Sequence, residues 1–223
     1  MIDYILVRSD RKTLSLYIRD GKLEARAPLR MSKKEIDRFI ISKEEWINEK
    51  LAKSTEQTAK RNNFSLTYGD KVRYRGEKYP IIAKPGNRIG FDDDGFYMPP
   101  DLSGDYIKRY CIEIYRLLAR KYLMEITPEF AKKMSVSPAA IKINNANTRW
   151  GSCSAKNSLN FSWKIIMADD DVINYIVVHE LAHIKELNHS AKFWEIVKSV
   201  IPNYKEKQKS LKKLQTQLLG ESW

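Results

Sequence analysis

Histidine, cysteine, glycine and proline are all scarce in this sequence of 223 residues, which has 3 His, 2 Cys, 9 Gly and 8 Pro. The two cysteines, Cys111 and Cys153, are too few to build a disulfide framework, and they fit a reducing compartment. Because 43% of the residues are hydrophobic and chain-breaking residues are few, we expect a packed core and not a disordered chain.

Long apolar runs are also missing. The first residues, MIDYILVRSDRK, reach charged side chains without the apolar segment of a signal peptide. No stretch approaches the roughly 20 apolar residues that span a bilayer. We therefore expect a soluble, cytoplasmic protein with no membrane partner.

The charge is strongly unbalanced, with a formal net charge of +12. A basic protein favours anionic partners such as nucleic acid, nucleotides or acidic protein surfaces. The densest basic run, YKEKQKSLKKL from Tyr204, alternates lysine with glutamate, glutamine and leucine, which is typical of a solvated helix face. Charge alone selects no function, although a nucleic-acid contact through the basic surface stays open.

The first part of the chain, residues 1–100, is predicted to be a β-rich region with one helix. Asp20-Gly21 is a type I′ hairpin signal, and Ser32 with Glu35 forms a capping box that opens the helix. The predicted segments are strands over residues 2–8, 13–19 and 22–27, a helix to about Ala52, a polar linker over 53–63 and short strands from Phe64 to Met98.

The second part, residues 101–223, is predicted to mix helices and strands, so the fold class is α+β. A helix is expected over residues 105–134, with a kink or break at Pro128. Residues 141–167 are expected to form two strands joined by a polar turn. Three aspartates then favour the start of a helix over the following apolar residues. Further helices are predicted after Ser190 and after Pro202.

All three histidines occur within the segment HELAHIKELNH, at His179, His183 and His189. A step of four residues along a helix turns the chain by about 400°, so the first two rings leave the same face. Two imidazoles placed in this way can bind one metal ion at about 2.0–2.1 Å. The neighbouring Glu180 completes the His-Glu-x-x-His pattern, in which zinc acidifies a water and the glutamate accepts its proton.

A catalytic zinc ion needs a third protein ligand and an open position. His189 is the natural candidate, because Asn188 can end one helix and Ser190 can cap the next, which places His189 on a tight corner. Glu195 and Glu206 are weaker alternatives. We predict one Zn²⁺ ion bound by His179, His183 and His189, with Glu180 as the general base.

The chain resembles the YgjP-like metallopeptidase family, which is itself similar to SprT-like and WLM-type zincins. The resemblance is carried by RWGSCS at 149–154, HELAH at 179–183, NHS at 188–190 and FW at 193–194, and it extends over nearly the whole chain. It implies a zincin-like catalytic domain in residues 101–223, whose active-site helix carries the zinc ligands and Glu180. By the same resemblance, the strand that starts at Ser158 is expected to pair with an extended substrate.

The segment before this strand supplies candidate substrate-binding residues. Arg149 offers a guanidinium fork to a carboxylate or phosphate, and Ser152 offers a donor to a developing oxyanion. Asn160, on the strand itself, is a third candidate. Each has a structural alternative, in which these side chains satisfy a turn or an ordinary sheet, Trp150 fills the core and Cys153 is a small buried residue.

Three functions remain open at this point. The leading hypothesis is a metallopeptidase that hydrolyses protein or peptide substrates with a zinc-activated water. The alternatives are a nucleotide phosphoanhydride hydrolase that uses the same water, and a nucleic-acid-associated protease of the SprT-like kind.

Overall fold

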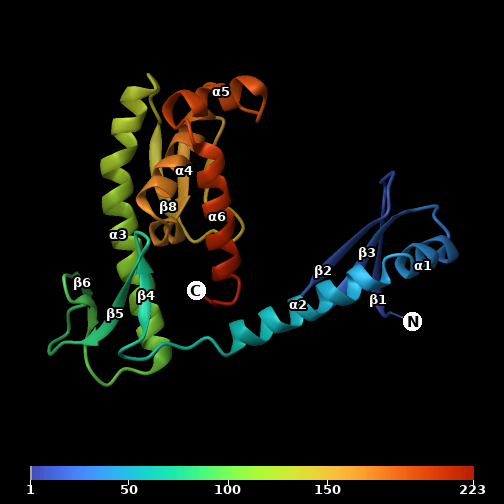
Figure 1. The fold of residues 1–223 in the computed structure, drawn as a ribbon, viewed down its shortest axis with the longest axis horizontal. Helices are drawn as coiled ribbons and strands as arrows, with labels where there is room; N and C mark the ends of the chain where they lie inside the picture. The colour runs from blue at the N-terminus through green and yellow to red at the C-terminus, as the bar shows by residue number, and fades with distance from the viewer. Residues whose placement is uncertain (1) are drawn as a thin grey trace. The chain divides into compact units, whose positions relative to one another are not determined.

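The computed structural model describes residues 2–223 and has mixed α and β structure (Figure 1). Within this range there are six α-helices, one 3-10 helix and three small sheets. The helices are α1 (Lys33–Ile41), α2 (Glu44–Asn62), α3 (Gly104–Lys133), η1 (Trp163–Met167, the 3-10 helix), α4 (Asp170–Ala182), α5 (Ala191–Val200) and α6 (Tyr204–Leu218). The strands are β1 (Tyr4–Ser9), β2 (Ser15–Arg19), β3 (Lys22–Pro28), β4 (Lys71–Tyr74), β5 (Glu77–Ala83), β6 (Gly90–Asp92), β7 (Gly95–Met98), β8 (Ala140–Asn144), β9 (Gly151–Cys153) and β10 (Ser158–Ser162).

The chain folds into two compact units. The first contains the residues up to Phe64 together with Gln217–Ser222, and the second contains Ser65–Thr216 and Trp223. The boundary that we predicted near residue 100 falls inside the second unit. There the strands β4–β7 pack on α3, where the ring of Phe96 lies 5.0 Å from that of Tyr115.

The first unit is a three-stranded sheet with two helices. The strand order is β1-β3-β2, with β1 parallel and β2 antiparallel to β3. Asp20 and Gly21 have φ values of 48° and 73°, which confirms the predicted type I′ turn. The capping box of Ser32 and Glu35 is also present at the start of α1. The buried core consists of Leu23, Ala25, Ala27, Ile36, Ile40 and Ile47.

The prediction of a polar linker over residues 53–63 was wrong, because helix α2 continues to Asn62. Two ion pairs at i,i+4 spacing, Glu49 with Lys53 and Glu56 with Lys60, lie along this helix. Such pairs stabilise a helix that has no continuous apolar stripe, and the absence of glycine and proline removes any strong break. The region therefore has two helices and not one.

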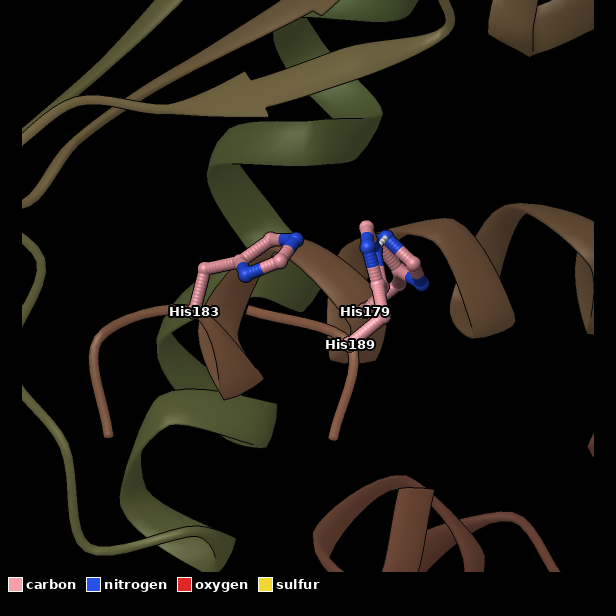
Figure 2. A group of neighbouring side chains, drawn as sticks. All are labelled: His179, His183 and His189. Carbon is pink, nitrogen blue, oxygen red and sulfur yellow. Dashed lines mark hydrogen bonds between the residues drawn. The ribbon is translucent and has the colours of Figure 1, made fainter. Parts of the chain in front are cut away.

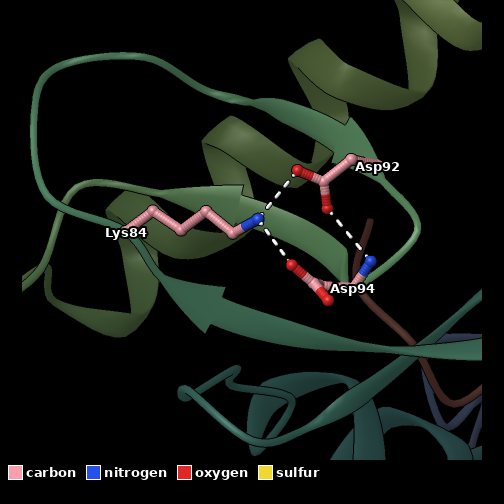
Figure 3. A network of polar contacts seen from close by, with 3 residues as sticks. All are labelled: Lys84, Asp92 and Asp94. Carbon is pink, nitrogen blue, oxygen red and sulfur yellow. Dashed lines mark hydrogen bonds and ion pairs between the residues drawn. The ribbon is translucent and has the colours of Figure 1, made fainter.

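In the second unit, a four-stranded sheet with the order β4-β5-β7-β6 carries a group of aromatic rings that contact one another. Lys84 follows β5 and joins the β6–β7 turn, since its Nζ lies 2.8 Å from Asp92 Oδ2 and 2.9 Å from Asp94 Oδ2 (Figure 3). Lys84 and Asp92 are partly exposed and Asp94 is exposed, so we assign the network to holding the turn and not to chemistry.

Helix α3 runs through Pro128, where we expected a kink or a break. Proline lacks the N–H that would bond the carbonyl four residues earlier, which belongs to Met124. The side chain of Met124 is 47% exposed, so this side of the helix faces solvent and water can satisfy the carbonyl. The helix therefore continues to Lys133.

The third sheet has the order β8-β10-β9, with β8 parallel and β9 antiparallel to β10. We expected two strands in this segment, and the polar turn in fact contains the additional short strand β9. The strand β10 is central and is paired on both edges. The expectation that this strand pairs with substrate was therefore wrong, because both of its hydrogen-bonding edges are already used.

In Figure 1, helix α4 lies between α3 and α6 within the second unit. The helix is almost wholly buried, including Val172, Ile173, Val177, Val178 and Leu181. None of the helices within residues 2–223 has both the length and the apolar character that a bilayer crossing requires.

Candidate metal centre

Helix α4 carries two of the three histidines, as predicted. Asp170 and Asp171 lie in its first turn, where their negative charges favour the helix N-terminus. His179 lies in the last turn and His183 is the C-cap residue, with helical φ and ψ of −64° and −17°. Because the helical geometry extends to His183, the four-residue spacing places both rings on one face.

The third histidine comes from the corner between α4 and α5. We expected this helix to end near Asn188, but α4 ends earlier, at Ala182. The Asn188 side chain instead accepts a hydrogen bond from the backbone N–H of Ser190 (3.0 Å). Ser190 caps α5 as predicted, with its Oγ accepting from the N–H of Phe193. These contacts fix the backbone on both sides of His189.

The three imidazoles converge (Figure 2). One nitrogen from each of His179, His183 and His189 lies within 4.8 Å of the others, and the Nε2 atoms of His179 and His189 are 3.0 Å apart. Two bonds of about 2.05 Å to one tetrahedral ion would place their nitrogens roughly 3.3 Å apart. The His179–His189 pair is close to this value and no pair is more than 4.8 Å apart, so the three side chains could hold a single metal ion.

The surroundings of His179 and His183 favour the neutral form of their rings. Burial lowers the pKa of His179 to about 3, and His183 and His189 lower it further through charge repulsion. Burial also lowers the pKa of His183. Nδ1 of His183 lies 3.1 Å from the carbonyl oxygen of Glu186, to which an Nδ1–H can donate, leaving Nε2 free. Neutral imidazoles with a defined free nitrogen are the form that binds metals.

Glu180 is buried beside this cluster, with only 6% of its surface exposed. Burial raises the pKa of its carboxyl from 4.5 to about 7, and the nearby Arg149 acts in the opposite direction. A carboxyl group with a pKa near neutrality can both accept and release a proton at physiological pH.

Strand β9 passes very close to this carboxyl group. A Cβ atom at Gly151 would lie 2.6 Å from Oε1 and 2.8 Å from Cδ of Glu180, closer than side chains normally pack. Only glycine permits this approach of the strand backbone to the helix. The face of β9 at Gly151 therefore packs directly against the buried carboxyl group of Glu180.

The predicted substrate-binding residues lie in different places. Arg149 is exposed and near enough to Glu180 to influence its pKa. Ser152 and Asn160 are cross-strand partners, and their neighbours Leu159 and Phe161 are fully buried. Since side chains alternate along a strand, Ser152 and Asn160 project from the opposite face of the sheet to the one that packs on α4.

The other candidate residues stay outside the cluster. Glu195 and Glu206 are exposed, and neither belongs to the group of nearby ligand atoms within residues 2–223. Cys153 is partly exposed, and burial together with the negative charge of Glu180 raises the pKa of its thiol. Trp150 is also partly exposed, and its carbonyl accepts from the N–H of Ser162 (2.8 Å).

Several aromatic residues around the histidines were missed by the sequence reasoning. The ring of Phe193 lies 4.6–4.9 Å from all three imidazoles. Trp194 stacks on His189, and Tyr175 Oη lies 3.5 Å from His179 Nδ1. The available signals were the Phe-Trp pair just after the last histidine and a tyrosine one helical turn before His179.

Comparison with known proteins defines the class. A model of a metallopeptidase domain matches residues 12–214, which places the protein among the metal-dependent peptidases. The family is the YgjP-like one, and the chain belongs to it. A comparison with curated proteins gave no match.

Two solved structures are similar to part of the chain. The metallopeptidase zymogen of Pyrococcus abyssi abylysin is 20% identical over 45% of this chain and 99% of its own, with a TM-score of 0.39. The metallopeptidase zymogen of Methanocaldococcus jannaschii jannalysin is 25% identical over 42% of this chain and 95% of its own, with a TM-score of 0.37.

Proposed function

We propose that the protein is a zinc-dependent peptidase with a zincin-like catalytic domain, in which His179, His183 and His189 hold one Zn²⁺ ion and Glu180 is the general base. The observation that carries this proposal is the convergence of three imidazole nitrogens within 4.8 Å, two of them from the helix that bears the buried carboxyl group of Glu180 and the third from the corner that follows it. A structural zinc site would not require a proton acceptor at that position.

Each part of the site has a role in peptide hydrolysis. A bound zinc ion supplies Lewis-acid polarisation of the scissile carbonyl and lowers the pKa of water towards about 7. Glu180 accepts the proton of the attacking water and then donates it to the leaving amine nitrogen. Arg149, exposed beside Glu180, provides a cation for a substrate carbonyl or carboxylate.

Strand β9 is the proposed docking strand for an extended peptide. It is last in the order β8-β10-β9, so one of its edges pairs with no other strand among the described residues. The backbone groups of Trp150 and Ser154 face β10. The carbonyl of Trp150 accepts a hydrogen bond from the N–H of Ser162 (2.8 Å), and the N–H of Ser154 donates to the carbonyl of Ser158 (3.0 Å). By alternation, the N–H groups of Gly151 and Cys153 point to the free edge of this strand, whose face at Gly151 contacts Glu180.

The family match favours peptide over the other substrates that we considered. The site contains a general base and a strand edge, and both suit an extended polypeptide. The net charge of +12 remains compatible with nucleotides and nucleic acid, but charge alone selects no substrate.

The test is a pair of glutamate variants of the full chain. Glu180→Gln keeps the shape and the three imidazoles, so we expect zinc content equal to that of the wild type and hydrolysis of an unfolded protein reduced roughly 10²–10⁴-fold. Glu195→Gln, the same change at an exposed site on α5, should leave both unchanged. A Glu180→Gln variant with wild-type turnover would contradict the assignment. Turnover of nucleoside triphosphates but not of protein would contradict the substrate class.

A further inference from the structure

Helix α6 contacts the outer side of the metal centre at two points. Its first residue, Tyr204, stacks on Trp194 with ring centroids 5.1 Å apart and planes at 13°. Trp194 in turn stacks on His189 at 5.6 Å and 24°. The three rings therefore form one continuous stack that begins on α6 and ends on the histidine that comes from a loop.

The second point lies one helical turn further along α6. Burial raises the pKa of Tyr175, and Gln208 lies near enough to its hydroxyl to act in the opposite direction. That hydroxyl lies 3.5 Å from Nδ1 of His179. Residues 204 and 208 are four apart, so they occupy the same face of the helix. A third contact, from Lys207 Nζ to Asp171 Oδ2 at 2.7 Å, fixes α6 along α4.

The need for such support differs among the three histidines. His183 bonds a nearby carbonyl, and His179 stands on a buried helix. His189 is exposed and lies between two helices, so its ring has more conformational freedom to lose on binding an ion. Offset and parallel ring stacking restricts that freedom and contributes packing energy.

We propose that α6 is a positioning element of the metal centre, in which Tyr204 orients His189 through Trp194 and Gln208 orients His179 through Tyr175. This inference rests on the proposed metal site and deepens it. The basic C-terminal helix thereby acquires a role in retaining the ion, beyond that of a solvated surface helix. Groups that orient ligands from outside typically change metal affinity about 10–100-fold when they are removed.

The experiment measures the Zn²⁺ affinity of the full-length protein by competition with a chromogenic chelator. Tyr204→Leu removes the stacking ring, and we expect about tenfold weaker binding. Tyr204→Phe keeps the ring and should restore wild-type affinity. Gln208→Leu should also weaken binding, whereas Gln215→Leu, the same change at an exposed position of α6, should not. Unfolding of the metal-free variants by urea separates lost affinity from lost stability.

A second readout is the visible absorption of bound Co²⁺, which depends on the number of ligands. Detachment of His189 in Tyr204→Leu should change this spectrum, while Gln215→Leu should leave it identical to the wild type. If Tyr204→Leu and Gln208→Leu both bind Zn²⁺ with wild-type affinity, the role of α6 is refuted and the proposed function stands. If the wild type itself binds neither ion, the proposed function fails together with this inference.

Discussion

The contact between Gly151 and Glu180 gives the sharpest prediction for a single added methyl group. In Gly151→Ala, the new Cβ would lie 2.6 Å from Oε1, 2.7 Å from Cγ and 2.8 Å from Cδ of Glu180. Ordinary contacts begin at about 3.4 Å, so the carboxyl group must move by roughly 0.8 Å. Because Gly151 does not have a positive φ, the effect is steric and does not come from backbone strain.

Two consequences of this displacement can be measured separately. Overpacking of this kind costs about 1–3 kcal/mol of stability, which urea unfolding can detect. A general base displaced by about 1 Å loses on the order of 10²-fold in rate. The imidazoles are not touched, so zinc content should stay at the wild-type level. Peptidase activity, metal content and unfolding are therefore assayed together.

A matched control is available at Gly220, where an added Cβ would meet only Lys60 at 3.4 Å, an ordinary contact. Gly220→Ala should therefore retain the wild-type rate. A Gly151→Ala protein with wild-type turnover would refute the argument that this close approach positions the base. Loss of zinc in Gly151→Ala would instead show that the change disturbs the histidines.

Two further predictions concern the same region. In the metal-free protein, burial raises the pKa of Glu180 from 4.5 to about 7, so the folded state binds this proton more tightly and stability falls as the pH rises between these values. Glutamine cannot ionise, so the Glu180→Gln variant does not lose this stability. The difference in unfolding free energy between the variant and the wild type should therefore shift in favour of the variant by about 3 kcal/mol from about pH 4 to pH 8. Urea unfolding measures this difference, and a value that does not change with pH would contradict the prediction. On β9, Cys153→Pro removes an outward N–H, and we expect about a fivefold increase in KM for a long peptide. Cys153→Ala should not change KM, and an equal KM in both variants would argue against docking on this edge.

The local features that sequence predicted best depend on neighbouring residues alone. The Asp20-Gly21 turn, the capping box at Ser32 and the cap at Ser190 follow from hydrogen bonds and φ preferences within four residues. The four-residue spacing of His179 and His183 likewise needs only a helix. Such features are independent of the rest of the fold.

The features that sequence did not predict depend on distant partners. The helix after Ala52 is an exception, because the i,i+4 ion pair of Glu56 with Lys60 is local and the polar composition of the segment concealed it. Strand β9 has three residues, and its pairing with β10 decides which edge remains free. The same pairing determines that Ser152 and Asn160 project away from Glu180. The presence of polar residues near a motif does not indicate on which face of the sheet their side chains lie.

The central claim is tested most directly by metal stoichiometry of the purified chain, measured beside the variants His179→Ala, His183→Ala and His189→Ala. The account predicts one zinc ion per wild-type chain and a marked loss of bound zinc in each of the three variants. A wild-type chain without zinc, or a His189→Ala variant that binds zinc as tightly as the wild type, would contradict it.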